Sequence, residues 1–370
     1  SSAASTASAA LLSAPELAAA AEDAGIIFVG PKTQTLIDLG DKVASRKLAE
    51  AADVPTVPAT DALPAGGDAA NEAGARVGLP VMVKASWGGG GRGMRRVYDA
   101  DKLADEVSAA KREAAAAFGK DDVYLEKLIE RARHVEIQVF GDTHGNVTHL
   151  FERDCSVQRR NQKVVEMAPA TWLDEETRQG MCQAAVRLAK ESGYQNAGTV
   201  EFLYDVNDGA FYFIEVNPRI QVEHTVTEEV TSVDIVKAQL LIAGGATLEE
   251  AGIPSAEADR RPRGVAIQCR VTTEDPENAF VPDYGKIVAY RSPAGFGVRL
   301  DGGTAFAGAV VTPHYDSLLA KVTVTAPDRD QGIARMSRAL AEFRIRGIKT
   351  NLPFLQRVIR HDDFRTGVLT

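Results

Sequence analysis

Residues 213–224, FIEVNPRIQVEH, carry a strongly polar side chain at every second position. Successive side chains of an extended chain point to opposite faces, so this alternation predicts a ribbon with one apolar and one polar face. The polar face would present two carboxylates, two amides and a guanidinium, those of Glu215, Asn217, Arg219, Gln221 and Glu223. A straight ribbon would separate the first and last of these by roughly 27 Å, because a strand rises about 3.3 Å per residue. That is too long for one anion and its metal, so we expect the segment to bend at Pro218.

A second carboxylate lies on a neighbouring predicted strand. The patterns over 198–205 and 210–216 are typical of two strands joined by a short turn, so Glu201 and Glu215 can face each other. Carboxylate oxygens, with Asn217 beside them, suit Mg²⁺, which completes its shell with nucleotide phosphates. The alternative is a hairpin face that forms only ion pairs. The additional asparagine and the lack of a lysine on the same face favour the metal.

A predicted strand over residues 80–86 contains Lys84 and is followed by a run of four glycines, Gly88, Gly89, Gly90 and Gly91. Such a run costs much backbone entropy on folding, so the loop should either approach a ligand closely or move. Free backbone amides can hold phosphate oxygens, although this is not a P-loop, because its lysine precedes the glycines. A flexible hairpin tip is the alternative. The glycines and Lys84 together favour contact with phosphate.

Several cations lie close together in residues 152–166, ERDCSVQRRNQKVVE, which include Arg153, Arg159, Arg160 and Lys163. From charge alone a solvated basic turn is the simplest interpretation, but in a protein of net charge −9 the turn could instead bind a small anion. His134 could be a ligand, a catalyst or a surface residue, and strand arginines such as Arg270 suit carboxylates and phosphates. Together these features indicate a nucleotide, a divalent metal and a small anion in one cleft, and hence phosphoryl transfer.

The elements that would position these groups alternate at first and then become mostly strands. We predict helices over residues 15–23, 36–54, 100–119, 174–192 and 328–343. We predict a linker over 54–68, and strands over 25–31, 80–86, 122–129, 134–142, 147–156, 198–205 and 210–216. The first of these strands should be buried, and more strands follow after residue 262. This order predicts the α+β class, with an antiparallel sheet around a cleft and a smaller mobile lobe.

The composition is that of an ordinary globular protein, since 45% of the 370 residues are apolar and 25% are charged. The net charge of −9 argues against nucleic acid and acidic membranes as partners, and no run reaches the roughly 18 apolar residues of a membrane span. The cysteines, Cys155, Cys182 and Cys269, suggest neither a disulfide framework nor a zinc site, so a reducing compartment fits best. Residues 1–14 are a Ser/Ala-rich stretch without an initiator Met, which we expect to be a processed, truncated or engineered start without function.

Four stretches occur in an order that resembles the ATP-grasp fold of biotin carboxylases: KASWGGGGRGM, RHVEIQVFGD, ERDCSVQRRNQKVVE and FIEVNPRIQVEHTVTE. The resemblance continues through GFGVRLDGG, HYDSLLAKV and GIKTNLPFL and covers roughly residues 11–370. The biotin carboxylase domain of pyruvate carboxylases is most similar in SWGGGG, RRNQK, DGGTAFAGAVVTPHYDS and GIKTNLPFLQ, with an acyl-CoA carboxylase subunit as the alternative. The resemblance implies four parts: a start with a Rossmann-like remnant (1–55), a glycine-loop lid (56–130), a catalytic subdomain (131–260) and a C-terminal biotin carboxylase-type region (261–370).

The resemblance also implies a role for each matched residue. ATP would be held by Lys42, Lys84, Gly88, Gly89, Gly90, Gly91, Glu126, Lys127, Ile129, His134 and Gln158. Mg²⁺ or Mn²⁺ would be held by Glu201, Glu215 and Asn217. Bicarbonate would be held by Lys163, Arg219, Gln221, Glu223 and the backbone of Val222. The catalytic residues would be Glu223 as general base, Lys163, Arg219 and Arg270, the last of which would stabilise the biotin enolate.

The implied reaction is ATP-dependent phosphorylation of bicarbonate to carboxyphosphate, followed by carboxylation of the ureido nitrogen of biotin. Bicarbonate is a poor nucleophile, so a base, a cationic site and a metal-bound γ-phosphate are all needed. No Met-Lys-Met sequence is present, so biotin would arrive on a carrier domain or protein, or free, with a carboxyltransferase domain elsewhere. The chain could also form a homodimer. The family suggests the cytoplasm, or the mitochondrial matrix in a eukaryote.

Two departures from the family matter. Most of the N-terminal Rossmann-like half expected before LLS…PELA is missing, which would expose a sheet edge. The chain could then be a truncated form that binds Mg-ATP without turnover. Asn161 stands where many stand-alone members have His and where pyruvate carboxylases commonly have Asn. A ligase that joins an acid to an amine is a weaker alternative, because RIQVEH and Arg270 match the bicarbonate and biotin pattern.

Overall fold

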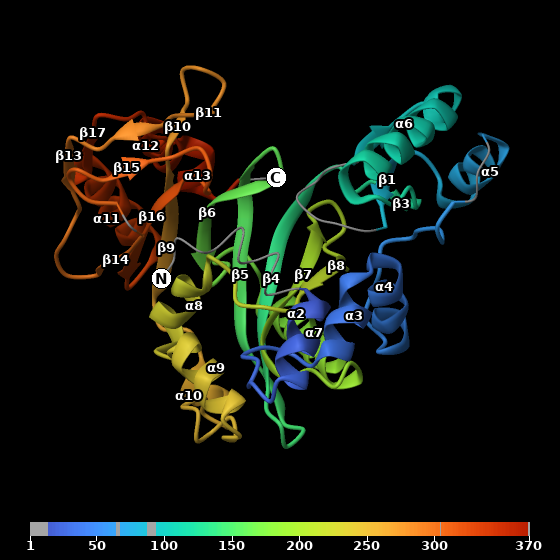
Figure 1. Cartoon of the computed structure of the whole chain (residues 1–370), viewed down its shortest axis with the longest axis horizontal. Helices are drawn as coiled ribbons and strands as arrows, with labels where there is room; N and C mark the ends of the chain where they lie inside the picture. Colours follow the sequence, from blue (N-terminus) through green and yellow to red (C-terminus); the bar gives the residue numbers. More distant parts are fainter. Residues whose placement is uncertain (1–13, 64–66, 87–93, 304, 369–370) are drawn as a thin grey trace.

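The computed structural model describes residues 14–63, 67–86, 94–303 and 305–368, and its main element is one large antiparallel sheet (Figure 1). The sheet has eight strands in the order β14-β16-β9-β6-β5-β4-β7-β8. In that order their bounds are Val298–Gly302, Leu318–Ala326, Val265–Thr272, Gln162–Ala168, Val147–Arg159, Ala132–Gly141, Asn196–Asp205 and Phe211–Asn217. This one sheet therefore contains strands from both the expected catalytic subdomain (131–260) and the expected C-terminal region (261–370). The predicted glycine loop, Gly88–Gly91, lies outside the described residues.

Alternation along β4 divides its side chains between the two faces of the sheet. Val135, Ile137 and Val139 are fully buried and pack with α7 (Glu175–Glu191) in one hydrophobic core. Glu136 and Gln138 point to the opposite face, where α8 (His224–Thr231) lies against β5 and β6. The sheet therefore separates an apolar layer on one side from a face on which buried polar groups gather.

The C-terminal strands carry a core of their own. Helices α11 (Arg329–Glu342) and α12 (Leu352–Arg360) pack on β9 and β16, and Ile267, Val322 and Met336 are buried between them. The remaining short strands and helices have the following bounds: β10 (Glu274–Asp275), β11 (Val281–Pro282), β12 (Gly285–Lys286), β13 (Ala289–Arg291), β15 (Val310–Val311), β17 (Arg344–Arg346), α9 (Ile235–Ala243), α10 (Glu257–Arg260) and α13 (Asp362–Thr366). The predicted α+β class is confirmed. Among the described helices, none has the length and apolar character needed to cross a bilayer.

A smaller lobe stands beside the large sheet, at the upper right of Figure 1. Its sheet has the order β2-β1-β3, with bounds Arg95–Val97, Val81–Ala85 and Val123–Lys127. Helices α5 (Gly67–Val77) and α6 (Ala100–Phe118) pack against this sheet in a separate core. The linker prediction was therefore partly wrong, because α5 begins at Gly67, inside the expected linker. Its Pro- and Gly-rich composition hid a helix that this core stabilises.

Two predictions near the start of the chain were wrong. The expected buried strand over 25–31 forms no strand, and Ile26 and Ile27 are 65% and 67% exposed, because no described strand pairs with it. The expected helix over 36–54 is interrupted, after the predicted and observed α2 (Pro15–Asp23), into α3 (Thr33–Gly40) and α4 (Lys42–Ala51). The interruption falls at Asp41, whose carboxylate accepts hydrogen bonds from the first backbone amides of α4 and so starts a new helix.

Candidate active site

A cavity of about 990 Å³ opens between the small lobe, the polar face of the large sheet and the C-terminal region. Its wall includes every predicted site residue that the structure describes: Lys42, Lys84, Glu126, Lys127, Ile129, His134, Gln158, Lys163, Glu201, Glu215, Asn217, Arg219, Gln221, Val222, Glu223 and Arg270. Residues that the sequence associated with nucleotide, metal and anion therefore line one shared space.

Residues 213–224, which were predicted to form a polar-faced ribbon, form a strand followed by a loop. Strand β8 ends at Asn217, because Pro218 has no N–H to donate to a sheet. The chain then bends at Arg219, whose N–H donates to the Asn217 carbonyl at 2.8 Å. The predicted bend is therefore confirmed, whereas the continuous ribbon to residue 224 was wrong. Glu223 directly precedes α8, and its carboxylate does not cap that helix but points to cations.

The strand itself departs from simple alternation. Glu201 and Glu215 are directly paired between β7 and β8, but the register shifts so that Phe202 pairs with Phe213. This bulge inserts Ile214 as an extra residue, which lets Phe213 enter the apolar core while Glu215 stays on the cavity side. Alternation alone would have placed Phe213 and Glu215 on the same face.

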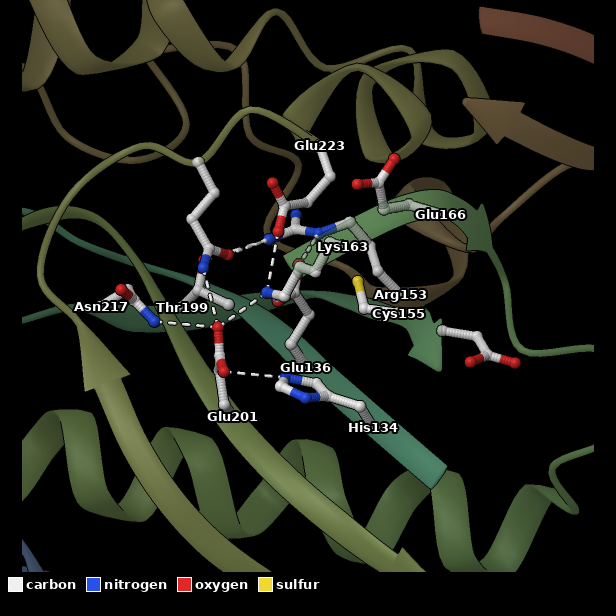
Figure 2. A network of polar contacts seen from close by, with 12 residues as sticks. His134, Glu136, Arg153, Cys155, Lys163, Glu166, Thr199, Glu201, Asn217 and Glu223 are labelled. Atoms are coloured by element: carbon white, nitrogen blue, oxygen red, sulfur yellow. Dashed lines mark hydrogen bonds and ion pairs between the residues drawn. The ribbon is translucent and has the colours of Figure 1, made fainter. Parts of the chain in front are cut away.

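The ammonium of Lys163 lies at the centre of the polar face (Figure 2). It contacts Glu136 and lies 2.8 Å from carboxylate oxygens of both Glu201 and Glu223. All three carboxylates are buried, at 0%, 4% and 2% exposure respectively. Burial lowers the pKa of Lys163, but the three negative charges raise it far more, so the net pKa is well above the usual value. Lys163 is therefore a permanent cation among the carboxylates.

Glu223 is held from two sides. Its second oxygen accepts a hydrogen bond from Arg270 at 2.9 Å, and the same guanidinium pairs with the fully buried Glu166. Burial raises the pKa of Glu223, but Lys163, Arg270 and Arg153 lower it more strongly, so the carboxylate is ionised at neutral pH. Burial raises the pKa of Glu166, partly offset by Arg270. The site thus presents an ionised carboxylate between two cations at the cavity wall.

The residues predicted to hold ATP lie at the end of the cavity next to the small lobe. Lys84 on β1 pairs with Glu126 on β3, and Lys42, at the start of α4, lies 3.3 Å from Glu215. The ammonium of Lys127 donates to the carbonyls of Gly78 and Leu79, at 3.0 and 2.8 Å. Cationic groups on α4 and β1 therefore converge on this end from different elements.

His134 and Gln158 connect this end to the carboxylates. The His134 Nε2 atom lies 2.8 Å from Glu201, and its Nδ1 atom lies 3.0 Å from the Gln158 amide. Burial lowers the pKa of His134, but the Glu201 charge raises it more, so the net shift is upward. His134 is therefore a partner of Glu201 rather than an isolated surface residue.

Glu201 and Glu215, the predicted metal ligands, are paired across two strands and face the cavity. Among the described residues, Glu201 also lies close to His134 and Glu136, and their potential ligand atoms are all within 4.8 Å of one another. Asn217 donates to Glu201 at 2.9 Å. The expectation that no lysine shares this face was wrong, since Lys163 reaches Glu201 from β6 and Lys42 reaches Glu215 from α4. That expectation considered only the hairpin itself.

Three further residues of this network were given no individual role from the sequence, although Arg153 was named there among the cations of the basic turn. Glu136 and Arg153 are fully buried and form an ion pair, and Lys321, on β16, donates to the Val222 carbonyl at 3.1 Å. A charged residue within an apolar strand pattern, such as Glu136 in HVEIQV, is the signal that could have identified it. No comparable local signal marks the partners of Lys321, because they are about 100 residues away in the chain.

Comparison with known proteins agrees with this arrangement. Residues 41–251 match the family described as carbamoyl-phosphate synthase L chain, ATP binding domain, and residues 268–370 match the biotin carboxylase C-terminal domain. A solved biotin carboxylase from Campylobacter jejuni is 40% identical, with a TM-score of 0.92, and the match covers 97% of this chain and 78% of that one. The chain belongs to the biotin carboxylase family.

Other members of this family are closer in sequence. Pyruvate carboxylase of Bacillus subtilis is 56% identical over 94% of this chain and 30% of its own length. A solved Rhizobium etli pyruvate carboxylase is 59% identical, with a TM-score of 0.93, over 97% of this chain and 32% of that one. The biotin carboxylase domain of Hydrogenobacter thermophilus 2-oxoglutarate carboxylase, solved with MgADP and bicarbonate, is 44% identical, with a TM-score of 0.92, over 97% of this chain and 78% of that one. The chain thus spans about 30% of the length of the curated pyruvate carboxylases.

Proposed function

We propose that the chain is a biotin carboxylase that uses ATP to phosphorylate bicarbonate and then carboxylates biotin. One observation carries the proposal: the Glu223 carboxylate lies between Lys163 and Arg270 in a cavity that the paired carboxylates Glu201 and Glu215 also line. Attack of bicarbonate on a γ-phosphate needs a base, cations that hold the anion, and hard oxygen ligands for a metal. Membership of the biotin carboxylase family supports the same assignment.

Bicarbonate would bind where the cations Lys163 and Arg219 and the amide of Gln221 face the cavity. Glu223 is ionised, because Lys163, Arg270 and Arg153 lower its pKa more than burial raises it. A bicarbonate oxygen would attack the γ-phosphorus while the bicarbonate proton passes to Glu223, and the bond to the β–γ bridging oxygen would break to release ADP. The proton becomes acidic as the oxygen bonds to phosphorus, so even a carboxylate of low pKa can accept it in the transition state.

The donor set fits Mg²⁺, since Glu201 and Glu215 offer hard carboxylate oxygens on one face. When bound, the metal would neutralise phosphate charge and favour the in-line arrangement of attacking and leaving oxygens. Lys42 and Lys84 would contact the phosphates, and Glu126, Lys127, Ile129, His134 and Gln158 would meet the adenosine. The present partners of Lys42 and Lys84 are carboxylates, so these lysines are already placed for negatively charged groups.

Arg270 would serve the second half of the reaction. Its guanidinium lines the cavity beside Glu223, where it can stabilise the negative charge that develops on the ureido oxygen of biotin. Biotin would be presented by a carrier domain or protein, and a carboxyltransferase would pass the carboxyl group on. The identities to pyruvate carboxylases favour pyruvate as the final acceptor, with an acyl-CoA as the alternative. The dimer formed by the related biotin carboxylase domain of 2-oxoglutarate carboxylase favours a homodimer as the assembly.

The proposal is tested by phosphate release from Mg-ATP as a function of bicarbonate and free biotin. The chain should release phosphate in a bicarbonate-dependent manner, and Glu223→Gln should remove that dependence while leaving Mg-ATP binding, measured by calorimetry, unchanged. Phosphate release that ignores both bicarbonate and biotin would contradict the proposal. Binding of Mg-ATP without any release would identify a nucleotide-binding form instead.

A further inference from the structure

Arg153, on β5, is fully buried and lies close to Glu136, Lys163 and Glu223 (Figure 2). All five of its N–H groups have acceptors. The Nε group pairs with Glu136, and the two terminal nitrogens donate to Gln138 at 2.7 Å, Thr227 at 3.0 Å, Thr199 at 3.1 Å and Gln221 at 3.0 Å. Because no donor is left over, Arg153 has no hydrogen bond to offer a substrate, and any role must act through these partners.

The contact with Gln221 determines which way that amide points. An arginine has donors but no acceptor, so only the oxygen of the Gln221 amide can face Arg153. The amide nitrogen must then point the other way, where it donates to Glu201 at 2.8 Å. Gln221 lines the cavity and is only 5% exposed, so this orientation turns its nitrogen, and not its oxygen, away from Arg153 and toward Glu201.

The contact with Glu136 has a similar effect on Lys163. One oxygen of Glu136 is taken by Arg153, which leaves the other oxygen for the Lys163 ammonium. The same ammonium contacts Glu223 at 2.8 Å. Arg153 therefore supports two neighbouring donors, the Gln221 amide and the Lys163 ammonium, from the same face of the sheet. The contacts of Arg153 with Gln221 and with Glu136 are charge-assisted and buried, which makes them costly to lose.

We propose that Arg153 is a positioning residue for the bicarbonate site, which sets the direction of the Gln221 amide and holds Lys163 through Glu136. This inference rests on the proposed function, since bicarbonate is the anion concerned. Arg153 does not contact the lysines of the nucleotide end, because Lys42 and Lys84 pair with Glu215 and Glu126. The link to that end is indirect, through Glu201, which Gln221 and Lys163 also contact. Loss of Arg153 should therefore weaken the use of bicarbonate more than the binding of Mg-ATP.

The experiment measures KM for bicarbonate and KM for Mg-ATP separately, in the intact protein, for Arg153→Gln and Arg153→Lys. A glutamine at position 153 no longer supplies the fixed charged donor that holds the Gln221 oxygen, so only the contact with Glu201 would still orient that amide. Arg153→Gln should raise KM for bicarbonate by about fivefold to 100-fold, because a buried polar group that loses its partner costs about 1–3 kcal/mol and each 1.4 kcal/mol is a factor of ten. KM for Mg-ATP should change less than about twofold. Arg153→Lys keeps the charge and should recover part of the loss.

Arg178→Gln is the matched control, because Arg178 also pairs with a buried carboxylate, Glu152, but lies outside the cavity. It should lower stability and leave the ratio of the two KM values unchanged. If Arg153→Gln merely repeats the Arg178→Gln result, the proposal is wrong. If Arg153→Gln does not fold, the KM ratio of Arg153→Lys decides: no selective rise for bicarbonate overturns the proposal.

A wild-type protein without bicarbonate dependence would refute the proposed function, and only the structural part of the inference, the orientation of Gln221 and Lys163 by Arg153, would then remain to be tested. A crystal structure of Arg153→Lys or Arg153→Gln then tests whether Arg153 orients the Gln221 amide and holds the Lys163 ammonium. The inference predicts a rotated Gln221 amide or a displaced Lys163 ammonium, and an unchanged arrangement of both would overturn it.

Discussion

Replacement of Lys163 by methionine removes one charge from the middle of three buried carboxylates. Methionine keeps most of the length of the side chain, so the change is mainly electrostatic. Glu136, Glu201 and Glu223 would keep their burial of 0%, 4% and 2% exposure and lose their common cation. Breaking a buried ion pair by removing one partner costs about 3–5 kcal/mol. We expect a loss of stability of that size near neutral pH, together with loss of bicarbonate-dependent phosphate release.

The loss should depend on pH in a definite direction. In the wild type, Lys163 is the strongest of the charges that lower the pKa of Glu223 below its usual value, against burial, which raises it. A lowered pKa contributes stability that is present above the unfolded pKa of about 4.5 and is lost as the pH falls through the folded value. Without Lys163 the pKa of Glu223 should rise, and the variant should recover stability relative to the wild type as the pH falls.

The assay is urea unfolding followed by the fluorescence of Trp172, in a Trp87→Phe background and at about pH 8 and about pH 5.5. Lys349→Met is the control, because Lys349 is 60% exposed and its partner Glu277 lies 3.6 Å away. The control should change the midpoint little at either pH. A Lys163→Met midpoint equal to that of the control, or a loss that does not shrink at the lower pH, would refute the electrostatic reasoning.

Three further predictions follow from the same contacts. The rate with bicarbonate, corrected for the ionisation of bicarbonate itself, should stay flat down to about pH 5.5, because the lowered pKa keeps Glu223 ionised; an acid limb near pH 7 would contradict this. Arg270→Ala should reduce carboxylation of free biotin about 100-fold or more and reduce Mg-ATP binding little; equal losses would count against a role on the biotin side. Asp41→Ala removes the cap of α4, so it should lower stability by about 1 kcal/mol and raise KM for Mg-ATP, because Lys42 begins that helix. An unchanged KM would show that the cap does not position Lys42 for ATP.

The part of the site that could be predicted from sequence is the part whose residues are close in sequence or follow a strand pattern. Glu201 and Glu215 were expected to face each other, and they are paired across β7 and β8. The length of the segment after Glu215 required a bend, and the chain bends directly after Pro218. The grouping of the anion residues with Arg270, by contrast, came from the resemblance to the family, because a strand arginine alone has many uses.

What could not be predicted depends on contacts between distant strands. The pairing of β6 with β9 places Lys163 and Arg270 on neighbouring strands although they are far apart in the sequence, and no local pattern reports such a pairing. The bulge at Ile214 also depends on the apolar core that draws Phe213 inward. At residues 25–31 the apolar composition favoured a buried strand, and this prediction was wrong, because a strand needs a partner and no described strand supplies one.

The central claim is that this cavity joins an oxygen of bicarbonate to the γ-phosphorus of ATP. The most direct measurement uses bicarbonate labelled with ¹⁸O and determines the label in the phosphate released from unlabelled ATP in unlabelled water, with a correction for exchange between bicarbonate and water. The account predicts one ¹⁸O atom in each phosphate for the wild type and no bicarbonate-dependent label transfer for Glu223→Gln. Phosphate whose fourth oxygen comes from water would contradict it.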